Sequence, residues 1–343
     1  LGIDYDGSRS ATAASTNYSL QNYANDVVAT VKECCEPCGV PVPTLVSESG
    51  RALASHFSVL VFDILGNGGA PDEIPVPRED DPLIVRNLHD TLSGISEGNL
   101  QEAWNDALKF KQDALSAFRL GYLSLPERAR AEQLAWACAR RIVKLLPQHD
   151  DMPEELRSLR AKLASTYYGN FSVFRSAPDT WAIDQLFPVM PIHRLNEQPD
   201  QLGSIADLTC DSDGKLARFI EGGKSKTLLE LHTPQEGEPY LLGLFLAGAY
   251  QEVMGNLHNL FGSTNAVHIR LAPGGGYRLD HVVRGDTNAE VLQAMEHDPD
   301  LMLERLRLAS EEAIREGRLA VSDARLLISH VSSSLQQSTY LQA

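Results

Sequence analysis

The sequence is short of basic residues and of long apolar runs. Lysine and arginine together number 30 against 46 acidic residues, which gives a formal net charge of -16 at pH 7. Nucleic acids and anionic membrane surfaces attract basic patches, so this charge argues against both as main partners. No apolar run reaches about 18 residues, the length that a membrane-spanning helix needs. We therefore expect no nucleic-acid partner and no membrane partner.

Cysteine is also scarce, and its spacing excludes a disulfide framework. The five cysteines are Cys34, Cys35, Cys38, Cys138 and Cys210. An odd, irregular set favours a reducing compartment, so we expect a cytoplasmic protein. Cys35 and Cys38 have the spacing of half a zinc site, but no second pair follows. We interpret them as cysteines at a helix end and predict no metal ligands among the side chains.

The beginning of the sequence does not resemble a natural N-terminus. LGIDYDG has no initiator methionine and no signal-peptide pattern, and it looks like the end of a strand and a turn. The 343 residues, 43% hydrophobic and 22% charged, are typical of a globular protein with two or three structural units. We expect the chain to be the later part of a longer protein.

The first part of the chain has an alternating pattern. Apolar spacing predicts a helix over 17–38, and Thr44–Val46 looks like a short strand. A polar turn and the apolar run Ala52–Leu65 follow. This order indicates an α/β barrel or doubly wound unit, in which catalytic groups follow the carboxyl ends of strands. Residues 66–82 are rich in glycine, proline and acids and are typical of a linker.

The next part has helical spacing and no cluster of catalytic side chains. Four helices are predicted, over Leu83–Leu92, Leu100–Leu120, Leu125–Leu146 and Pro153–Tyr168. Asn99 and Ser124 are the expected N-caps, and Pro126 suits an early helical position. We interpret this part as a small inserted bundle with a structural or assembly role.

The rest of the chain is first strand-like and then helical. Strands are predicted at Phe171–Phe174, Ile205–Leu208, Leu228–Leu231, Tyr240–Ala247, Val267–Leu271 and Tyr277–Val283. A helix over Gly248–Phe261 interrupts them, and helical spacing resumes from about 288 to 338. We predict a β-rich domain followed by helices.

Glu48-Ser49-Gly50-Arg51 stands just after the expected strand at Thr44–Val46. A glycine lets backbone N–H groups approach a phosphate, and an arginine adds positive charge. A carboxylate can keep the ring nitrogen of a heteroaromatic cofactor protonated. The alternative is a Glu–Arg pair in a surface turn, and the local sequence leaves both open.

The stretch TCDSDG, residues 209–214, puts a thiol directly beside carboxylates. Free cysteine is usually buried and inert. Here Asp211 and Asp213 disfavour a thiolate, which suits a proton donor better than a nucleophile. The acids can also attract a cation. An inert cysteine in a capped turn is the alternative.

Tyrosine and histidine side chains give weaker signals. Tyr250 follows an apolar strand and presents its hydroxyl to a phosphate or packs as a core ring. We interpret His193, His258 and His268 as structural, because no partners stand at metal-ligand spacing.

Four stretches, taken in order, resemble one family: VSESGRALASHF, FPVMPIHRLNE, ADLTCDSDGK and LFLAGAYQEVMGNLHNLFGSTNAVHI. They are similar to the biosynthetic arginine decarboxylases of bacteria and plants, pyridoxal-phosphate enzymes related to ornithine and diaminopimelate decarboxylases. The resemblance covers essentially the whole chain. It implies an α/β plus β fold with these parts: the end of a PLP-binding (β/α)8 barrel (1–75), an inserted helical bundle (83–168), a β-sandwich or β-barrel domain (171–286) and a C-terminal helical extension (287–343).

The resemblance also implies which residues hold pyridoxal 5'-phosphate. Glu48 would pair with the pyridinium nitrogen. Gly50, Arg51 and Tyr250 would frame the phosphate group. LGIDYDG resembles the tail of the family's glycine-rich phosphate loop, of which only Gly2 is present.

For the substrate, the resemblance implies that Cys210 reprotonates the α-carbon after CO2 leaves, across a dimer interface. Asp211, alone or together with Asp213, would hold the cationic end of L-arginine, and the runner-up placement gives that role to Asp213. The implied reaction gives agmatine and CO2 and leads to polyamines such as putrescine and spermidine. The implied assembly is a homodimer with shared active sites, or a tetramer, and the resemblance leaves open whether Mg2+ assists.

One departure concerns the lysine that carries the cofactor. None of the eight lysines follows an early barrel strand, and Lys215 belongs to the β-rich part. We expect this lysine upstream of the chain, and the chain alone to be inactive. Two alternatives stay open: a decarboxylase of ornithine, lysine or diaminopimelate, or a non-catalytic fragment or homologue that pairs with an intact subunit.

Overall fold

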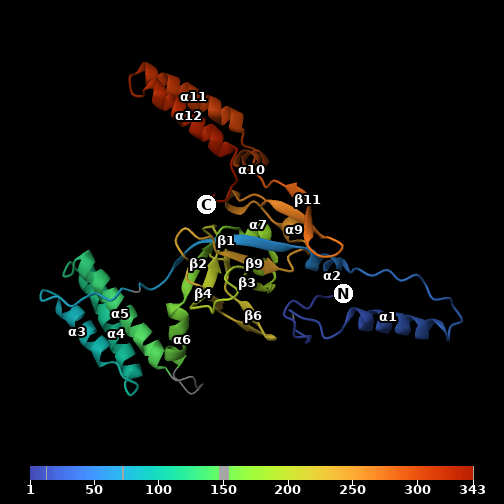
Figure 1. Ribbon diagram of the computed structural model, residues 1–343, viewed down its shortest axis with the longest axis horizontal. Helices are drawn as coiled ribbons and strands as arrows, with labels where there is room; N and C mark the ends of the chain where they lie inside the picture. Colours follow the sequence, from blue (N-terminus) through green and yellow to red (C-terminus); the bar gives the residue numbers. More distant parts are fainter. Residues whose placement is uncertain (13, 72, 147–153, 343) are drawn as a thin grey trace.

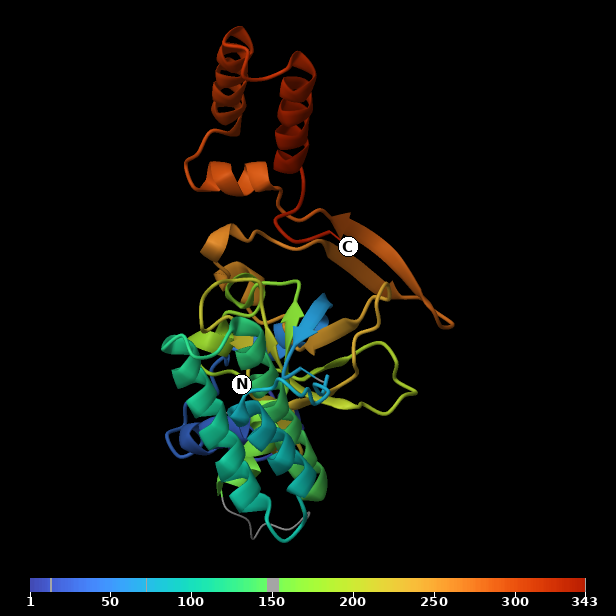
Figure 2. The ribbon, with the colours of Figure 1, turned by 90° about the vertical axis from the view of Figure 1, so that its left-hand side faces the viewer.

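The computed structural model describes residues 1–12, 14–71, 73–146 and 154–342. A central β-sheet lies between two helical parts, a bundle on one side and a helical extension on the other (Figures 1 and 2). No described helix combines the length and the apolar character that crossing a bilayer demands.

The central sheet takes its strands from distant parts of the chain. In spatial order they are β3 (Val189–Pro191), β9 (Leu241–Phe245), β1 (Val59–Gly68), β2 (Ser165–Gly169), β4 (Gln201–Ala206) and β5 (Lys215–Leu216), with β8 (Leu229–Leu231) also paired to β4. Only β2 and β4 run parallel among these pairs. β1 comes before the helical bundle in sequence, and it pairs with β9 and β2 after the bundle. The chain therefore leaves the sheet, builds the bundle and returns to the same sheet.

One apolar core fills the sheet region. Phe62 of β1 stacks on Phe171, with ring centroids 4.2 Å apart. Tyr167 of β2 is fully buried, and its hydroxyl donates to the His232 carbonyl at 3.2 Å. Burial of such rings is the main favourable term in folding, and the buried hydroxyl retains a partner.

A second core lies inside the helical bundle. The bundle consists of α3 (Leu83–Gly94), α4 (Leu100–Arg119), α5 (Leu125–Leu145) and α6 (Glu154–Leu163). Leu88, Leu134 and Ile142 are fully buried in it. Ser124 and Glu127 form the capping box that starts α5, as expected for an N-cap serine. Asn99 stands at the N-cap of α4 without a capping bond, because its side chain bonds to Ser96 and Gly94.

The bundle is tied to the segment before it by a buried ion pair. The Asp81 carboxylate accepts from Arg130 Nη2 at 2.7 Å and from Arg130 Nε at 3.0 Å. Burial raises the pKa of Asp81, but its contacts with Arg130, Arg78 and His89 outweigh burial, and the pKa lies below its usual value. This pair therefore fixes the linker on the bundle.

The helical extension ends by returning to the sheet region. It comprises α10 (Asn288–Ala294), α11 (Pro299–Arg315) and α12 (Val321–Leu335), and the last two lie side by side (Figure 2). The Tyr340 hydroxyl donates to the Gly262 carbonyl at 2.8 Å, and Asn170 bonds to Leu341.

An exposed hairpin, β10 (Ala266–Leu271) with β11 (Tyr277–Val283), has the predicted strands and turn.

Four local predictions are wrong. Thr44–Val46 is not a strand, and the helix expected through Tyr168 ends earlier, since Ser165–Gly169 is β2. Residues 173–176 form the short helix α7 in place of a strand. The helix expected at Gly248–Phe261 is reduced to α9 (Gln251–Met254) and a 3-10 turn. Pairing of β2 with β1 and β4 overrides the helical propensity of residues 165–169. Thr44–Val46, in contrast, is exposed and has no partner among the described strands. The predicted helix start at Pro153 lies outside the described residues.

Candidate functional site

Gly50, Arg51 and Tyr250 lie together, although about 200 residues separate them in sequence. Gly50 begins α2 (Gly50–Ala54), and Tyr250 precedes α9 with a left-handed backbone, φ 68°. The Arg51 guanidinium carbon lies 5.5 Å from the centroid of the Tyr250 ring. A Cβ atom added to Gly50 would overlap the Tyr250 hydroxyl, so only glycine allows this approach. Tyr250 is 43% exposed and is not a core residue.

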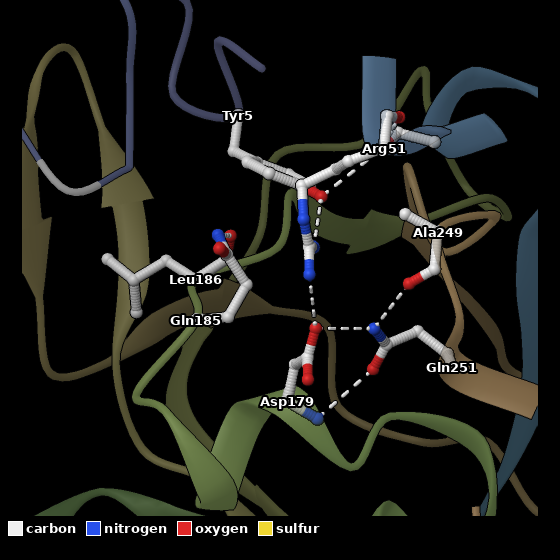
Figure 3. A network of polar contacts seen from close by, with 8 residues as sticks. Tyr5, Arg51, Asp179, Gln185, Leu186, Ala249 and Gln251 are labelled. Atoms are coloured by element: carbon white, nitrogen blue, oxygen red, sulfur yellow. Dashed lines mark hydrogen bonds and ion pairs between the residues drawn. The ribbon is translucent and has the colours of Figure 1, made fainter. Parts of the chain in front are cut away.

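Arg51 is held by two partners from other parts of the chain (Figure 3). Its Nη1 donates to the Tyr5 hydroxyl at 3.1 Å, and its Nη2 donates to the Asp179 carboxylate at 3.2 Å. The Asp179 side chain is 4% exposed and that of Arg51 is 28% exposed. Partial burial lowers the pKa of Arg51, but the contacts with Tyr5 and Asp179 outweigh burial and leave the pKa above its usual value. Arg51 is therefore a fixed cation that still faces solvent.

Asp179 and Gln251 join through two reciprocal hydrogen bonds (Figure 3). Asp179, at the start of α8 (Asp179–Ala182), donates its backbone N–H to Gln251 Oε1 at 3.1 Å. Gln251 Nε2 donates to the Asp179 carboxylate at 2.8 Å and to the Ala249 carbonyl at 2.9 Å. Local sequence patterns gave no sign that Tyr5, Asp179 or Gln251 belongs to a site. Only the Pro-Asp pair that starts α8 carried a local signal, and it indicates a helix start, not a site.

The turn after β4 carries the Cys210 thiol, and the buried Asp207 carboxylate holds the backbone of this turn in place. Asp207 is 5% exposed and accepts from the Thr209 backbone N–H, the Thr209 hydroxyl and the Val173 N–H, all at 2.7–2.8 Å. A Cβ atom on Gly214 would overlap the Asp207 carboxylate. The capped-turn interpretation of TCDSDG is therefore correct for its backbone, and Asp207 is the residue that makes the cap.

The three candidate side chains of this turn have different surroundings. Cys210 is exposed, and Asn259 Nδ2 lies 3.4 Å from its Sγ. The Asp211 carboxylate lies 3.4 Å from His258 Nε2, and the His258 ring packs 4.3 Å from the Phe174 ring, centroid to centroid. His258, interpreted from sequence as structural, thus contacts a candidate site residue.

Asp213 and Glu48 are both exposed. Asp213 lines a cavity of about 300 Å³ together with Lys215, Asp184 and Arg218. Glu48 lies in the irregular segment before α2 and makes no hydrogen bond or ion pair with the described residues. Within the described ranges, no group of three or more histidine, cysteine or acidic side chains stands in a metal-binding arrangement.

Loss of the Asp207 carboxylate should destabilise the turn. We expect Asp207→Ala to lower the free energy of unfolding by about 1.5–3 kcal/mol, because buried N–H and hydroxyl donors lose a charged acceptor. Chemical denaturation would measure the difference. Asp213→Ala is the matched control, since Asp213 is exposed and should change stability by less than about 0.5 kcal/mol. Equal stability of the two variants would contradict this role of Asp207.

Family models match two segments of the chain. Residues 78–160 match the arginine decarboxylase helical bundle domain, and residues 289–341 match the arginine decarboxylase C-terminal helical extension. These segments correspond to the bundle α3–α6 and to the helices α10–α12.

Whole-chain relatives are biosynthetic arginine decarboxylases. The chain is 72% identical to that of Synechococcus sp. (strain RCC307) and 68% identical to that of Prochlorococcus marinus (strain MIT 9313), with 100% of this chain covered in both. It spans about half the length of these relatives, 54% in each. The crystal structure of the biosynthetic arginine decarboxylase from Campylobacter jejuni matches 96% of this chain and 53% of its own, with 30% identity and a TM-score of 0.79.

The fold and the matched segments define a protein of the arginine decarboxylase class: a barrel-like sheet with an inserted helical bundle and a C-terminal helical extension. The predicted fold class is thereby confirmed, whereas the predicted boundaries between the parts stay a prediction. The chain belongs to the biosynthetic arginine decarboxylase family. It spans about half the length of the relatives that it matches.

Proposed function

We propose that this chain takes part in the decarboxylation of L-arginine to agmatine and CO2, a step toward putrescine and spermidine, with pyridoxal 5'-phosphate as cofactor. The relatives' shared name supports the reaction. The structural observation that carries the proposal is the exposed Cys210 thiol beside the Asp211 carboxylate, on a turn that Asp207 pins. The proposed location is the cytoplasm, and the proposed assembly is a homodimer or tetramer.

The residues present fit the phosphate group of the cofactor. We call Gly50, Arg51 and Tyr250 the candidate phosphate site. It offers a fixed guanidinium, the phenol hydroxyl of an exposed tyrosine and a glycine without a side chain in the way. A guanidinium and a hydroxyl are suitable donors to phosphate oxygens. When bound, the cofactor supplies an electron sink for the carbanion at the α-carbon.

Glu48 is proposed to keep the ring nitrogen of the cofactor protonated. A carboxylate near a pyridinium nitrogen is the usual protein contribution to this electron sink. In the structure the Glu48 side chain is exposed, two residues before α2 and three before Arg51. One short segment of the chain would therefore contact both the ring nitrogen, through Glu48, and the cofactor phosphate, through Gly50 and Arg51.

Cys210 is proposed to return a proton to the α-carbon after CO2 leaves. The Sγ–H bond breaks, the α-carbon gains the proton, and solvent later restores the thiol. Asn259 lies within hydrogen-bond distance of Sγ and orients the thiol. Since Cys210 is exposed, it can reach a second subunit, as sharing of active sites in a homodimer requires.

Asp211 and Asp213 are the two candidates for the cationic end of the substrate. A guanidinium is planar and suits bidentate pairing with a carboxylate, whereas an ammonium is a point charge. Asp211 also contacts His258, and Asp213 lines the cavity beside Lys215. Both acids therefore remain candidates for binding the guanidinium group of the substrate.

Mutation of the two acids should separate their roles. The Asp211 side chain is 36% exposed, so solvent screens part of its charge. We expect Asp211→Asn to raise KM for L-arginine at least about tenfold, equivalent to about 1.4 kcal/mol, with the cofactor spectrum unchanged. Steady-state kinetics of Asp211→Asn and Asp213→Asn on arginine, lysine and ornithine would measure it. Glu304→Gln is the control, since Glu304 is an exposed acid paired with Arg307 in the helical extension, away from both candidates. If neither variant changes the preference among the three substrates, selection lies with other residues.

The lysine that carries the cofactor is proposed to come from residues other than those of this chain. The test is borohydride reduction of the chain with pyridoxal 5'-phosphate, followed by intact mass. We expect no covalent adduct at a single lysine, and we expect CO2 release from L-arginine only after completion with the unmatched part of the Synechococcus relative. Turnover by the chain alone would overturn this division of the site. A purified complete protein without any CO2 release from arginine would overturn the proposed function. Metal removal by chelator, during the same assay, tests whether Mg2+ assists.

A further inference from the structure

We propose that Asp179 and Gln251 are a positioning pair that sets Arg51 and Tyr250 in the geometry needed to bind a phosphate monoester. This inference rests on the proposed function, because it takes Gly50, Arg51 and Tyr250 as the site of the cofactor phosphate. Neither Asp179 nor Gln251 is proposed to touch the phosphate. They act through the two residues that do.

The pair is rigid and shielded from water. Asp179 is 3% exposed and Gln251 is 1% exposed. Two hydrogen bonds close a ring between them, from the Asp179 N–H to Gln251 Oε1 and from Gln251 Nε2 to the Asp179 carboxylate. The buried amide has partners on both of its polar atoms, and the carboxylate accepts two hydrogen bonds on one oxygen. Neither group can rotate without losing partners, so their positions are fixed.

One arm of the pair holds Arg51. The same Asp179 oxygen that accepts from Gln251 accepts from Arg51 Nη2, and the Tyr5 hydroxyl accepts from Nη1 (Figure 3). A guanidinium has five N–H donors, so others remain for an anion. Arginine otherwise loses side-chain entropy when it binds a ligand. Because Arg51 is already held, a phosphate that binds it causes less of that loss.

The other arm holds the backbone next to Tyr250. Gln251 Nε2 donates to the Ala249 carbonyl, the residue just before Tyr250. Tyr250 has φ 68°, a left-handed conformation that is uncommon for a bulky residue and persists only when the surroundings enforce it. The hydrogen bond from the Gln251 side chain to the Ala249 carbonyl stabilises this backbone conformation. It thereby keeps the Tyr250 hydroxyl close to Gly50.

The charge of Asp179 and its positioning role predict opposite changes in phosphate binding, so an experiment can distinguish them. The Asp179 carboxylate offsets the positive charge of Arg51, so charge alone predicts that Asp179→Asn strengthens the binding of phosphate. Positioning predicts that Asp179→Asn weakens it. Gln251→Met changes no charge and nearly keeps the side-chain volume, so it isolates the positioning effect.

The experiment compares three ligands on the whole chain. Inorganic phosphate, pyridoxal 5'-phosphate and pyridoxal would be titrated against the wild-type chain and the variants Gln251→Met, Asp179→Asn and Tyr5→Phe. Tyr5→Phe removes a single hydroxyl and serves where the other variants fail to fold. Asp81→Asn is the matched control, because Asp81 also sits in a buried ion pair with an arginine, but in the helical bundle.

We expect Gln251→Met and Asp179→Asn to weaken binding of both phosphate ligands at least about tenfold, equivalent to about 1.4 kcal/mol. Tyr5→Phe should weaken it less, while pyridoxal binding stays unchanged in all variants and Asp81→Asn has no effect on any ligand. Unchanged or stronger phosphate binding in the variants would overturn the inference alone. Equal loss for pyridoxal would also overturn it, because the pair would then be only structural. If the wild-type chain binds neither inorganic phosphate nor pyridoxal 5'-phosphate more tightly than pyridoxal, the proposed phosphate site is wrong. The inference is then wrong as well.

Discussion

Cys210→Ala in a catalytically competent preparation that contains this chain is expected to lower kcat on L-arginine by about 10²–10⁴-fold, the usual contribution of a positioned proton donor. The thiol is exposed, and its sulfur accepts a hydrogen bond from Asn259 Nδ2. The Kd for pyridoxal 5'-phosphate should stay the same, because Cys210 lies on a different turn from Gly50, Arg51 and Tyr250. CO2 release and a cofactor titration would measure the two quantities.

The products of this variant give a second measurement. Without the thiol, the proton is expected to arrive at the wrong carbon, so part of the product should be an aldehyde in place of agmatine. Cys38→Ala is the matched control, since Cys38 is another exposed free cysteine, at the end of the helical region near the N-terminus. Unchanged turnover and clean agmatine from Cys210→Ala would rule out the proton-donor role.

Glu48→Ala is expected to slow the decarboxylation step by about 10²–10³-fold, the effect of removing a key electrostatic partner of the reacting system. In the proposed function the Glu48 carboxylate would keep the ring nitrogen protonated, and loss of that proton would weaken the electron sink. Single-turnover kinetics would isolate the step from product release. A cofactor analogue with a permanent positive charge on its ring should restore part of the rate, because it no longer needs the carboxylate.

The control for this prediction is Glu33→Ala, an exposed glutamate on α1 (Leu20–Cys35). It removes one negative charge from the same part of the sequence and should leave the single-turnover rate unchanged. A near wild-type rate for Glu48→Ala, or an equal loss for the Glu33 variant, would count against the assigned role.

Parts of the candidate site were accessible from sequence because their signals are local. TCDSDG combines a thiol, acids and a turn within six residues, and the structure shows that turn with Cys210 exposed. Gly50 and Arg51 are adjacent in VSESGRALASHF, one of the stretches that carry the resemblance. The pairing of Gly50 with Tyr250 follows from the resemblance, not from spacing, since nothing local relates residues 200 positions apart.

Other parts could not be predicted in this way. Asp207 looked like the end of a strand, and its role as the buried acceptor beneath the turn requires the Val173 N–H from another element. The helix predicted after Gly248 failed for a similar reason. Tyr250 has a left-handed backbone just before α9, and α9 ends after Met254 because the backbone of Gly255 is extended.

By itself the sequence determined the acidic net charge, the helices of the bundle and of the extension, and the family. These depend on composition, on the 3.6-residue spacing of apolar side chains and on short motifs, all of which are properties of neighbouring residues. Only the tertiary structure decided that β1 and β2 pair on either side of the bundle. It alone also decided that Tyr5, Asp179 and Gln251 hold Arg51 and Tyr250. The hydrogen bonds to Arg51 span 46 and 128 residues, and the Asp179–Gln251 bonds span 72. Contacts at such separations form only when the whole core brings the elements together, so no local pattern records them.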